Sequence, residues 1–145
     1  MLPHNLKPIE YKNLRKWTFQ FCYQQEMNQQ FSYTEKSIEQ FVQNFEIEKK
    51  LQDLFKVFVA EVFKCKPKSD MLIEKFTKNW KMNRIAKVDL SLLRIAVTEL
   101  LLRTETDTAV IISEALSLAE EFSSENSFAF LNGILDSISK EIRVG

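Results

Sequence analysis

The 145-residue sequence contains few of the residues that interrupt helices. It has 2 glycines and 3 prolines, while 45% of its residues are hydrophobic and 12 are phenylalanine. So little glycine and proline beside so many apolar residues argues against a sheet protein with many tight turns and against a disordered chain. A chain of this length can bury one substantial core and is too short for two comfortable domains. We therefore expect a single compact all-α domain.

Long apolar runs are absent from the sequence, and cysteine and histidine are rare. No run approaches the roughly 20 apolar residues that a membrane helix needs, and the N-terminus lacks the apolar segment of a signal peptide. We therefore expect a cytoplasmic protein with no membrane segment. The single histidine, His4, falls in a tail before the first expected helix. Cys22 and Cys65 fall within apolar helical patterns, which favours reduced, buried thiols over a disulfide or a metal site.

Sets of residues that could support catalysis are also missing. Glu120 and Glu121 are adjacent on an expected helix and so point about 100° apart, which is poor geometry for a catalytic pair. Ser113, Ser117 and Ser127 have no histidine near them in the expected fold. We predict no enzymatic activity, no catalytic residue, no metal site and no cofactor.

The clearest pattern that is present is a wide apolar stripe at helical spacing in residues 84–103. A stripe this wide is typical of a helix that is covered on several sides, so we expect a central helix here. Arg94 and Glu99 lie within this apolar surface, and a buried charge needs a partner. Structural ion pairs are the favoured interpretation for both. The stripe consists of Val88, Leu92, Leu93, Ile95, Ala96, Val97, Leu100, Leu101 and Arg103.

Helical periodicity and capping signals predict about seven helices in two helical subdomains, at about 8–80 and about 84–143. Pro67 is expected to begin the fourth helix, with Trp80 facing the core. Gly133 falls inside the last helix, where we expect it to allow the close approach of a neighbouring backbone. The expected helices are 8–27, one opened by a capping box at Ser32–Glu35, 47–64, one from Pro67 to about 80, 84–103, one capped by Asp107, and a last one ending near Arg143.

Charge is distributed unevenly, although the net charge is zero. Residues 64–87 contain eight basic and two acidic residues, whereas residues from 88 to the end contain ten acidic and four basic ones. This polarity indicates one face for an anionic partner and another for a basic partner. A solvated surface without a partner explains the charges equally well.

Three segments of the C-terminal half read VDLSLLRIAVTELLLR, ISEALSLAEEF and ENSFAFLNGILD. These segments resemble the NusB family of transcription antitermination factors. The match is thinner in the first half, where Arg15, Gln20 and Tyr23 fit a pattern of basic residues followed by Q-x-x-Y. The C-terminal residues that fit the family pattern are Asp89, Leu93, Arg94, Ala96, Glu99, Leu100, Glu114, Ala115, Leu118, Ala119, Phe122, Ser127, Phe130, Asn132, Gly133, Leu135 and Asp136.

This resemblance implies an RNA-binding factor that binds a boxA RNA together with the ribosomal protein NusE, within an antitermination complex on RNA polymerase that promotes ribosomal RNA transcription. Where family members have an arginine-rich run, this chain reads EYKNLRK, and fewer cations imply weaker, less salt-sensitive RNA binding. The RNA-binding candidates are Lys12, Arg15, Lys16 and Tyr23, all expected on exposed or partly exposed faces.

The acidic half of the chain would suit a basic ribosomal protein, because opposite charges steer docking. The candidate residues for partner binding are Glu114, Glu120, Glu121 and Glu125. Two alternatives remain open: a NusB-fold interaction protein or homodimer that has lost RNA binding, and the NusB-like domain of a ribosomal RNA methyltransferase.

Overall fold

The computed structural model describes residues 5–30, 32–77 and 82–143. Within these ranges every regular element is a helix, which confirms the predicted all-α class. His4, Trp80, Lys78 and Lys81 lie outside the described residues. The elements are α1 (Pro8–Met27), α2 (Glu35–Asn44), α3 (Lys49–Lys75), the 3-10 turn η1 (Met82–Arg84), α4 (Lys87–Leu102), α5 (Thr108–Phe122) and α6 (Ser127–Ile142).

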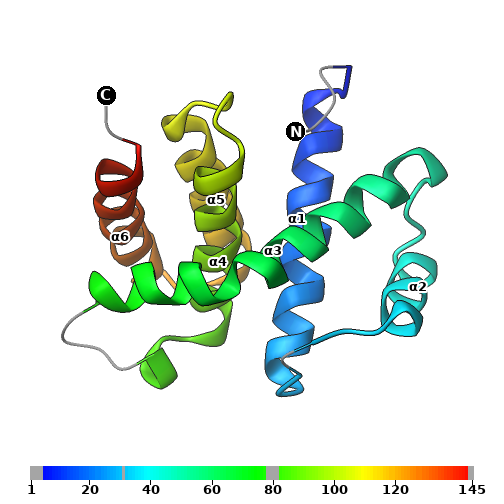
Figure 1. Ribbon diagram of the computed structural model, residues 1–145, viewed down its shortest axis with the longest axis horizontal. Helices are drawn as coiled ribbons and strands as arrows, with labels where there is room; N and C mark the ends of the chain where they lie inside the picture. The colour runs from blue at the N-terminus through cyan, green and yellow to red at the C-terminus, as the bar shows by residue number, and fades with distance from the viewer. Residues whose placement is uncertain (1–4, 31, 78–81, 144–145) are drawn as a thin grey trace.

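Helix α4 is the element on which the others pack, as its wide apolar stripe predicted. It contacts α1, α3, α5 and α6, and Leu93 and Val97 on it are fully buried. Figure 1 shows α4, α5 and α6 next to one another, with the long helix α3 crossing both α4 and α1. Because α4 is covered on several sides, its polar side chains must find partners inside the protein.

The prediction of two helices separated at Pro67 is wrong, because the single helix α3 covers both segments. It runs unbroken over 27 residues with Pro67 inside it, although an interior proline costs about 3 kcal/mol. Pro67 is exposed, whereas Val62 before it and Leu72 after it are both buried in the same cluster. The packing of one continuous apolar stripe against α4 therefore outweighs the local cost of the proline.

Helix α2 begins later than its predicted cap. The cap residue is Thr34, whose Oγ1 accepts a hydrogen bond from the Ser37 N–H at 3.1 Å, while the Thr34 N–H donates to Ser37 Oγ at 3.0 Å. A capping box is therefore present, but its residues are not the predicted Ser32 and Glu35. This register turns Ile38 and Phe41 toward the core.

The buried apolar residues form two clusters that share two helices. One cluster lies among α4, α5 and α6 with parts of α1 and α3. The other lies among α1, α2 and the first half of α3, where Phe41 and Phe55 stack with ring centroids 5.2 Å apart. Because α1 and α3 contribute to both clusters, the clusters do not by themselves divide the chain near residues 80–84. The division into two helical subdomains stays a prediction.

Gly133 does not serve the close approach that the sequence suggested. A Cβ atom built on it would meet nothing within 4 Å, because Gly133 lies on the exposed face of α6. Leu131, Ile134 and Leu135 occupy the opposite, buried face. That part of the prediction is wrong, and an alanine would fit at this position without a steric clash.

The two cysteines are free thiols. Cys22 is buried, and burial raises its pKa to about 12. Cys65 is half-buried, so it is more accessible than predicted. In the described part of the chain, no His, Cys, Asp or Glu side chains gather into a group that could hold a metal ion. None of the described helices combines the length and apolar character needed to cross a membrane.

Candidate nucleic-acid and partner interface

The start of α1 is held in place by a network around Glu10. Pro8 occupies the first turn, as predicted. The Lys7 N–H donates to Glu10 Oε1 at 2.8 Å, and Lys50 Nζ lies 2.8 Å from Glu10 Oε2. The hydrogen bond from Lys50 is the main cause that lowers the pKa of Glu10. This network fixes the helical turn that presents Lys12.

Lys12 and Lys16 lie one turn apart on α1 and face two acids of α5. Lys12 Nζ is 3.1 Å from Glu114 Oε1, and Lys16 Nζ is 2.6 Å from Glu121 Oε1. The structure therefore brings predicted RNA-binding cations together with predicted partner-binding acids, which the sequence had assigned to different partners. Both lysines keep exposed side chains. Exposed pairs of this kind contribute about 0 to 1 kcal/mol, so an anionic ligand can replace the carboxylates.

Arg15 is buried, so the expectation that it lies on a more exposed face is wrong. Its Nε lies 2.8 Å from Oε1 and 3.1 Å from Oε2 of Glu99 on α4. Burial raises the pKa of Glu99, and the positive charge of Arg15 opposes that shift. Glu99 occupies the middle of the covered helix, and Arg15 is its counterion. The guanidinium is therefore already committed within the protein.

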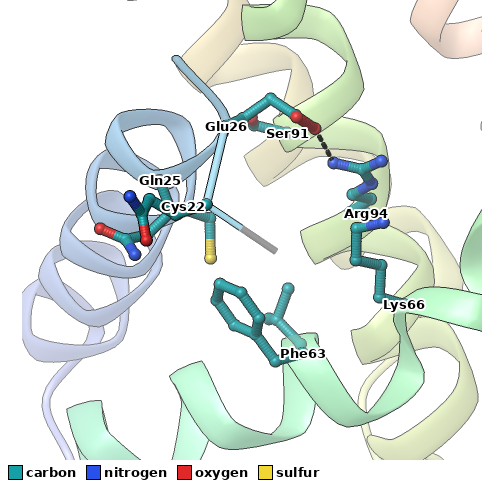
Figure 2. Close-up of a pocket in the computed structure, with 9 residues that line it drawn as sticks. Cys22, Gln25, Glu26, Phe63, Lys66, Ser91 and Arg94 are labelled. Carbon is teal, nitrogen blue, oxygen red and sulfur yellow. Dashed lines mark hydrogen bonds and ion pairs between the residues drawn. The ribbon is translucent and has the colours of Figure 1, made fainter. Parts of the chain in front are cut away.

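Two further arginines of α4 and its C-terminus make structural ion pairs. Arg94 donates to Asp70 Oδ1 at 2.7 Å and Oδ2 at 3.1 Å, and also to Glu26. Figure 2 shows the Arg94 guanidinium joined to Glu26 at one side of a pocket that Cys22 also lines. Arg103 similarly pairs with Glu61 at 2.6 Å. The prediction that Arg94 and Glu99 take part in structural pairs is confirmed.

The cavity in Figure 2 is too small to be the functional site. It lies between α1, α3 and α4 and has a volume of about 20 Å³, which is room for about one water molecule. Ser91 lines it with a hydroxyl that has no hydrogen-bond partner among the described residues. The functional surfaces must therefore be sought on the outside of the bundle.

Tyr23 extends the lysine-bearing side of α1. It is half-buried and stacks on Phe19, with ring centroids 6.0 Å apart and an angle of 26° between the rings. Residues 12, 16 and 23 differ by 4 and 7 positions, which places their side chains on one side of a helix. The arrangement offers two cations and the edge of an aromatic side chain over roughly 16 Å.

The four predicted partner-binding acids divide into two groups. Glu114 and Glu121 face α1, whereas Glu120 and Glu125 make no ion pair with any described residue and line the space between α5 and α6. We call this space the α5–α6 groove. It is lined by Ala109, Ile112, Ser113, Leu116, Ser117, Ala119, Glu120, Ser123, Ser124, Glu125, Phe128 and Asn132.

A hydrogen-bond cluster that the sequence analysis did not identify holds the turn between α5 and α6. Ser123 Oγ donates to Asp89 Oδ1 at 2.6 Å, and Ser127 Oγ donates to Asp89 Oδ2 at 2.8 Å. Asp89 lies in the first turn of α4. The cluster positions the neighbouring Glu125 and Phe128. Asp89 and Ser127 both fit the family pattern in the sequence, but that pattern did not reveal that they contact each other.

The described part of the basic stretch 64–87 carries some uncompensated charge. Lys64 and Lys68 are exposed and make no ion pair with a described residue, whereas Lys66 pairs with Asp70 at 3.1 Å. The two free lysines lie one turn apart on α3. The exposed face of α3 that carries these two lysines is the part of the stretch available to an anionic ligand. The apolar side chain of Met71 is exposed on the same helix.

Comparison with known proteins gives one consistent result. The model of the NusB family matches residues 12–140. A transcription antitermination protein NusB from Finegoldia magna is 39% identical over 126 residues, covering 87% of this chain and 90% of that protein. One from Clostridium perfringens is 35% identical over 131 residues, covering 89% and 96%.

Solved structures agree with the sequence comparison. A structure of NusB from T. maritima has a TM-score of 0.80 and 30% identity, and the likeness covers 90% of each chain. A chain from a complex of the antitermination factors NusB and NusE with double-stranded RNA has a TM-score of 0.80 and 20% identity. That likeness covers 93% of this chain and 99% of the other, and at this identity it supports the fold alone.

Proposed function

Because this chain belongs to the NusB family, we propose that it is an RNA-binding transcription antitermination factor without catalytic activity. The observation that carries the proposal is similarity along nearly the whole chain to proteins named for transcription antitermination. Its partners would be a boxA RNA and the ribosomal protein NusE, since NusB has been solved in complex with NusE and RNA. Acting in the cytoplasm, this assembly would join RNA polymerase and promote ribosomal RNA transcription.

The proposed RNA surface is the side of α1 that carries Lys12, Lys16 and Tyr23. Phosphate groups would replace Glu114 and Glu121 as partners of the two lysines, which costs little because these pairs are exposed. The half-buried ring of Tyr23 would stack on an unpaired base. Arg15, predicted as a fourth contact, would support this surface from below by holding α1 against Glu99.

The proposed surface for NusE comprises acids on both sides of α5 and in the turn that follows it. A ribosomal protein is usually basic, and complementary charge speeds its association. The acids proposed to act in this way are Glu114, Glu120, Glu121 and Glu125.

Two observations favour a second function, that of an interaction protein of the same fold, alone or as a homodimer, that no longer binds RNA. Lys12 and Lys16 are both neutralised by acids of the same chain, and the arginine-rich run is replaced by EYKNLRK. Much of the affinity for RNA comes from cations that neutralise its phosphates. Lysines that are already paired with carboxylates of the same chain would therefore bind RNA more weakly.

A titration of fluorescently labelled RNA separates the two functions. The anisotropy of a boxA RNA would be followed on addition of the chain, with and without NusE, against a scrambled RNA of equal length. The antitermination factor is expected to bind boxA more tightly than the scrambled RNA, and more tightly still with NusE. Binding to NusE without any binding to boxA would support the second function instead.

A further inference from the structure

We propose that two acids of α5, Glu114 and Glu121, lower the RNA affinity of the chain by competing with RNA phosphates. The groups for which they compete are the side chains of Lys12 and Lys16 on α1. This inference rests on the proposed function and adds a restraint on the same RNA surface. The two carboxylates act as an autoinhibitory contact, which RNA has to displace in order to use the full charge of the lysines.

Each lysine of the RNA surface is held by one carboxylate of α5. Lys12 Nζ donates to both carboxylate oxygens of Glu114, at 3.1 and 3.2 Å. Lys16 Nζ lies 2.6 Å from Glu121 Oε1 and 5.4 Å from the centre of the Phe122 ring. A carboxylate oxygen at this distance stands where a phosphate oxygen would stand. A lysine that is already neutralised in this way gains less when it meets a phosphate.

The two pairs differ in how strongly they should compete with RNA. The side chain of Glu114 is 21% exposed, whereas that of Glu121 is 50% exposed. Salt and water screen a pair of charges less when the pair is more buried. Glu114 should therefore be the stronger competitor of the two.

The charge of Glu114 is not needed to hold the fold together. Burial is the main cause that raises the pKa of Glu99, and the negative charge of Glu114 adds to that shift. The two carboxylates therefore repel each other inside the helical bundle. A glutamine at position 114 removes this repulsion and has nearly the same size, so the variant should fold at least as stably as the unaltered chain.

A gain of RNA affinity after removal of the two acids tests the proposal. The anisotropy of fluorescently labelled boxA RNA would be followed with the full chain at one fixed salt concentration. An exposed pair contributes up to about 5-fold to an equilibrium constant. Glu114→Gln with Glu121→Gln should therefore tighten binding about 3-fold to 10-fold, and Glu114→Gln alone should give the larger share. Circular dichroism and urea unfolding would verify the fold of each variant.

A matched control removes the same amount of charge without touching the lysine pairs. Asp53→Asn with Glu120→Gln changes two exposed acids that make no ion pair with a described residue. Glu120 is adjacent to Glu121 in the sequence but lines the α5–α6 groove instead of facing α1. Because distant exposed charges are screened by salt, this control should bind RNA within about 2-fold of the unaltered chain.

A double-mutant cycle separates competition for the lysines from a general effect of charge. The two acid changes would be repeated in a chain that carries Lys12→Gln with Lys16→Gln, where no ammonium group remains to be released. We expect tightening only in the chain that keeps both lysines. Equal tightening in both chains, or none beyond that of the control, would overturn the proposal and leave the proposed function standing. Absence of RNA binding by both the unaltered chain and the acid variant would overturn the proposal together with the RNA-binding function.

Discussion

Leu92 and Ile95 show at the scale of single residues why α4 organises the fold. Their side chains are 1% and 4% exposed, so shortening either one leaves a cavity among packed helices. Leu92→Ala and Ile95→Ala should each lower the free energy of unfolding by about 2 to 5 kcal/mol. Urea denaturation would measure this, with Leu102→Ala as the control because Leu102 is exposed. Losses below about 0.5 kcal/mol for both core variants would contradict this packing.

Residue patterns could reveal that Arg94 and Glu99 needed partners, but could not identify those partners. Glu99 pairs with Arg15, which lies 84 positions earlier in the chain. Helical spacing gives the orientation of a side chain relative to its own helix, whereas the neighbour that covers it depends on how the helices pack. The same limit explains why Arg15 was expected on a more exposed face.

At the scale of elements, apolar periodicity was sufficient for most helices. Residues 8–27 form α1 with the predicted bounds, and α5 follows Asp107 as expected, although the Asp107 side chain makes no capping hydrogen bond. The failures came from local signals that were given too much weight. Pro67 was interpreted as a helix start, and the Ser32–Glu35 motif as a cap, but packing against α4 and the core decided both.

Replacing Pro67 tests whether α3 is a continuous helix that tolerates an unfavourable residue. Pro67→Ala restores a backbone N–H and removes a ring that clashes with the preceding turn. After allowing for the greater freedom that alanine gives the unfolded chain, the variant should be about 2 kcal/mol more stable. Thermal and urea unfolding would report the change, and a loss of stability would mean that the proline is needed where it is.

The lysine-bearing side of α1 makes a second prediction at this scale. Lys12→Gln with Lys16→Gln should weaken boxA binding and flatten the slope of log affinity against log salt concentration by roughly 1.4, at about 0.7 per single-strand contact. Arg15 stays unchanged, because its removal would leave Glu99 buried without a counterion. Lys49→Gln with Lys36→Gln, on other exposed surfaces, is the control. An unchanged slope in the α1 variant would place the RNA elsewhere, with Lys64 and Lys68 the next candidates.

At the scale of the whole molecule, the unequal charge of the two halves is partly cancelled within the fold. Cations of α1 meet acids of α5 across about 100 positions of sequence. The sequence identified the kinds of residue at the interface but not this pairing. It also did not reveal the α5–α6 groove, since a groove exists only once two helices have been placed side by side. On the described parts of α5, α6 and the turn between them, Glu120, Glu125 and Phe128 are exposed, and the two acids make no ion pair with a described residue.

Terminator readthrough tests the central claim most directly. Transcription would be measured in a bacterial extract depleted of its own copy of this protein, on templates with an intact or scrambled boxA before a terminator. Adding the purified chain should increase readthrough on the intact template and leave the scrambled one unchanged. The variant Lys12→Gln with Lys16→Gln should restore less. Equal readthrough with and without the chain on the boxA template would contradict a role in antitermination.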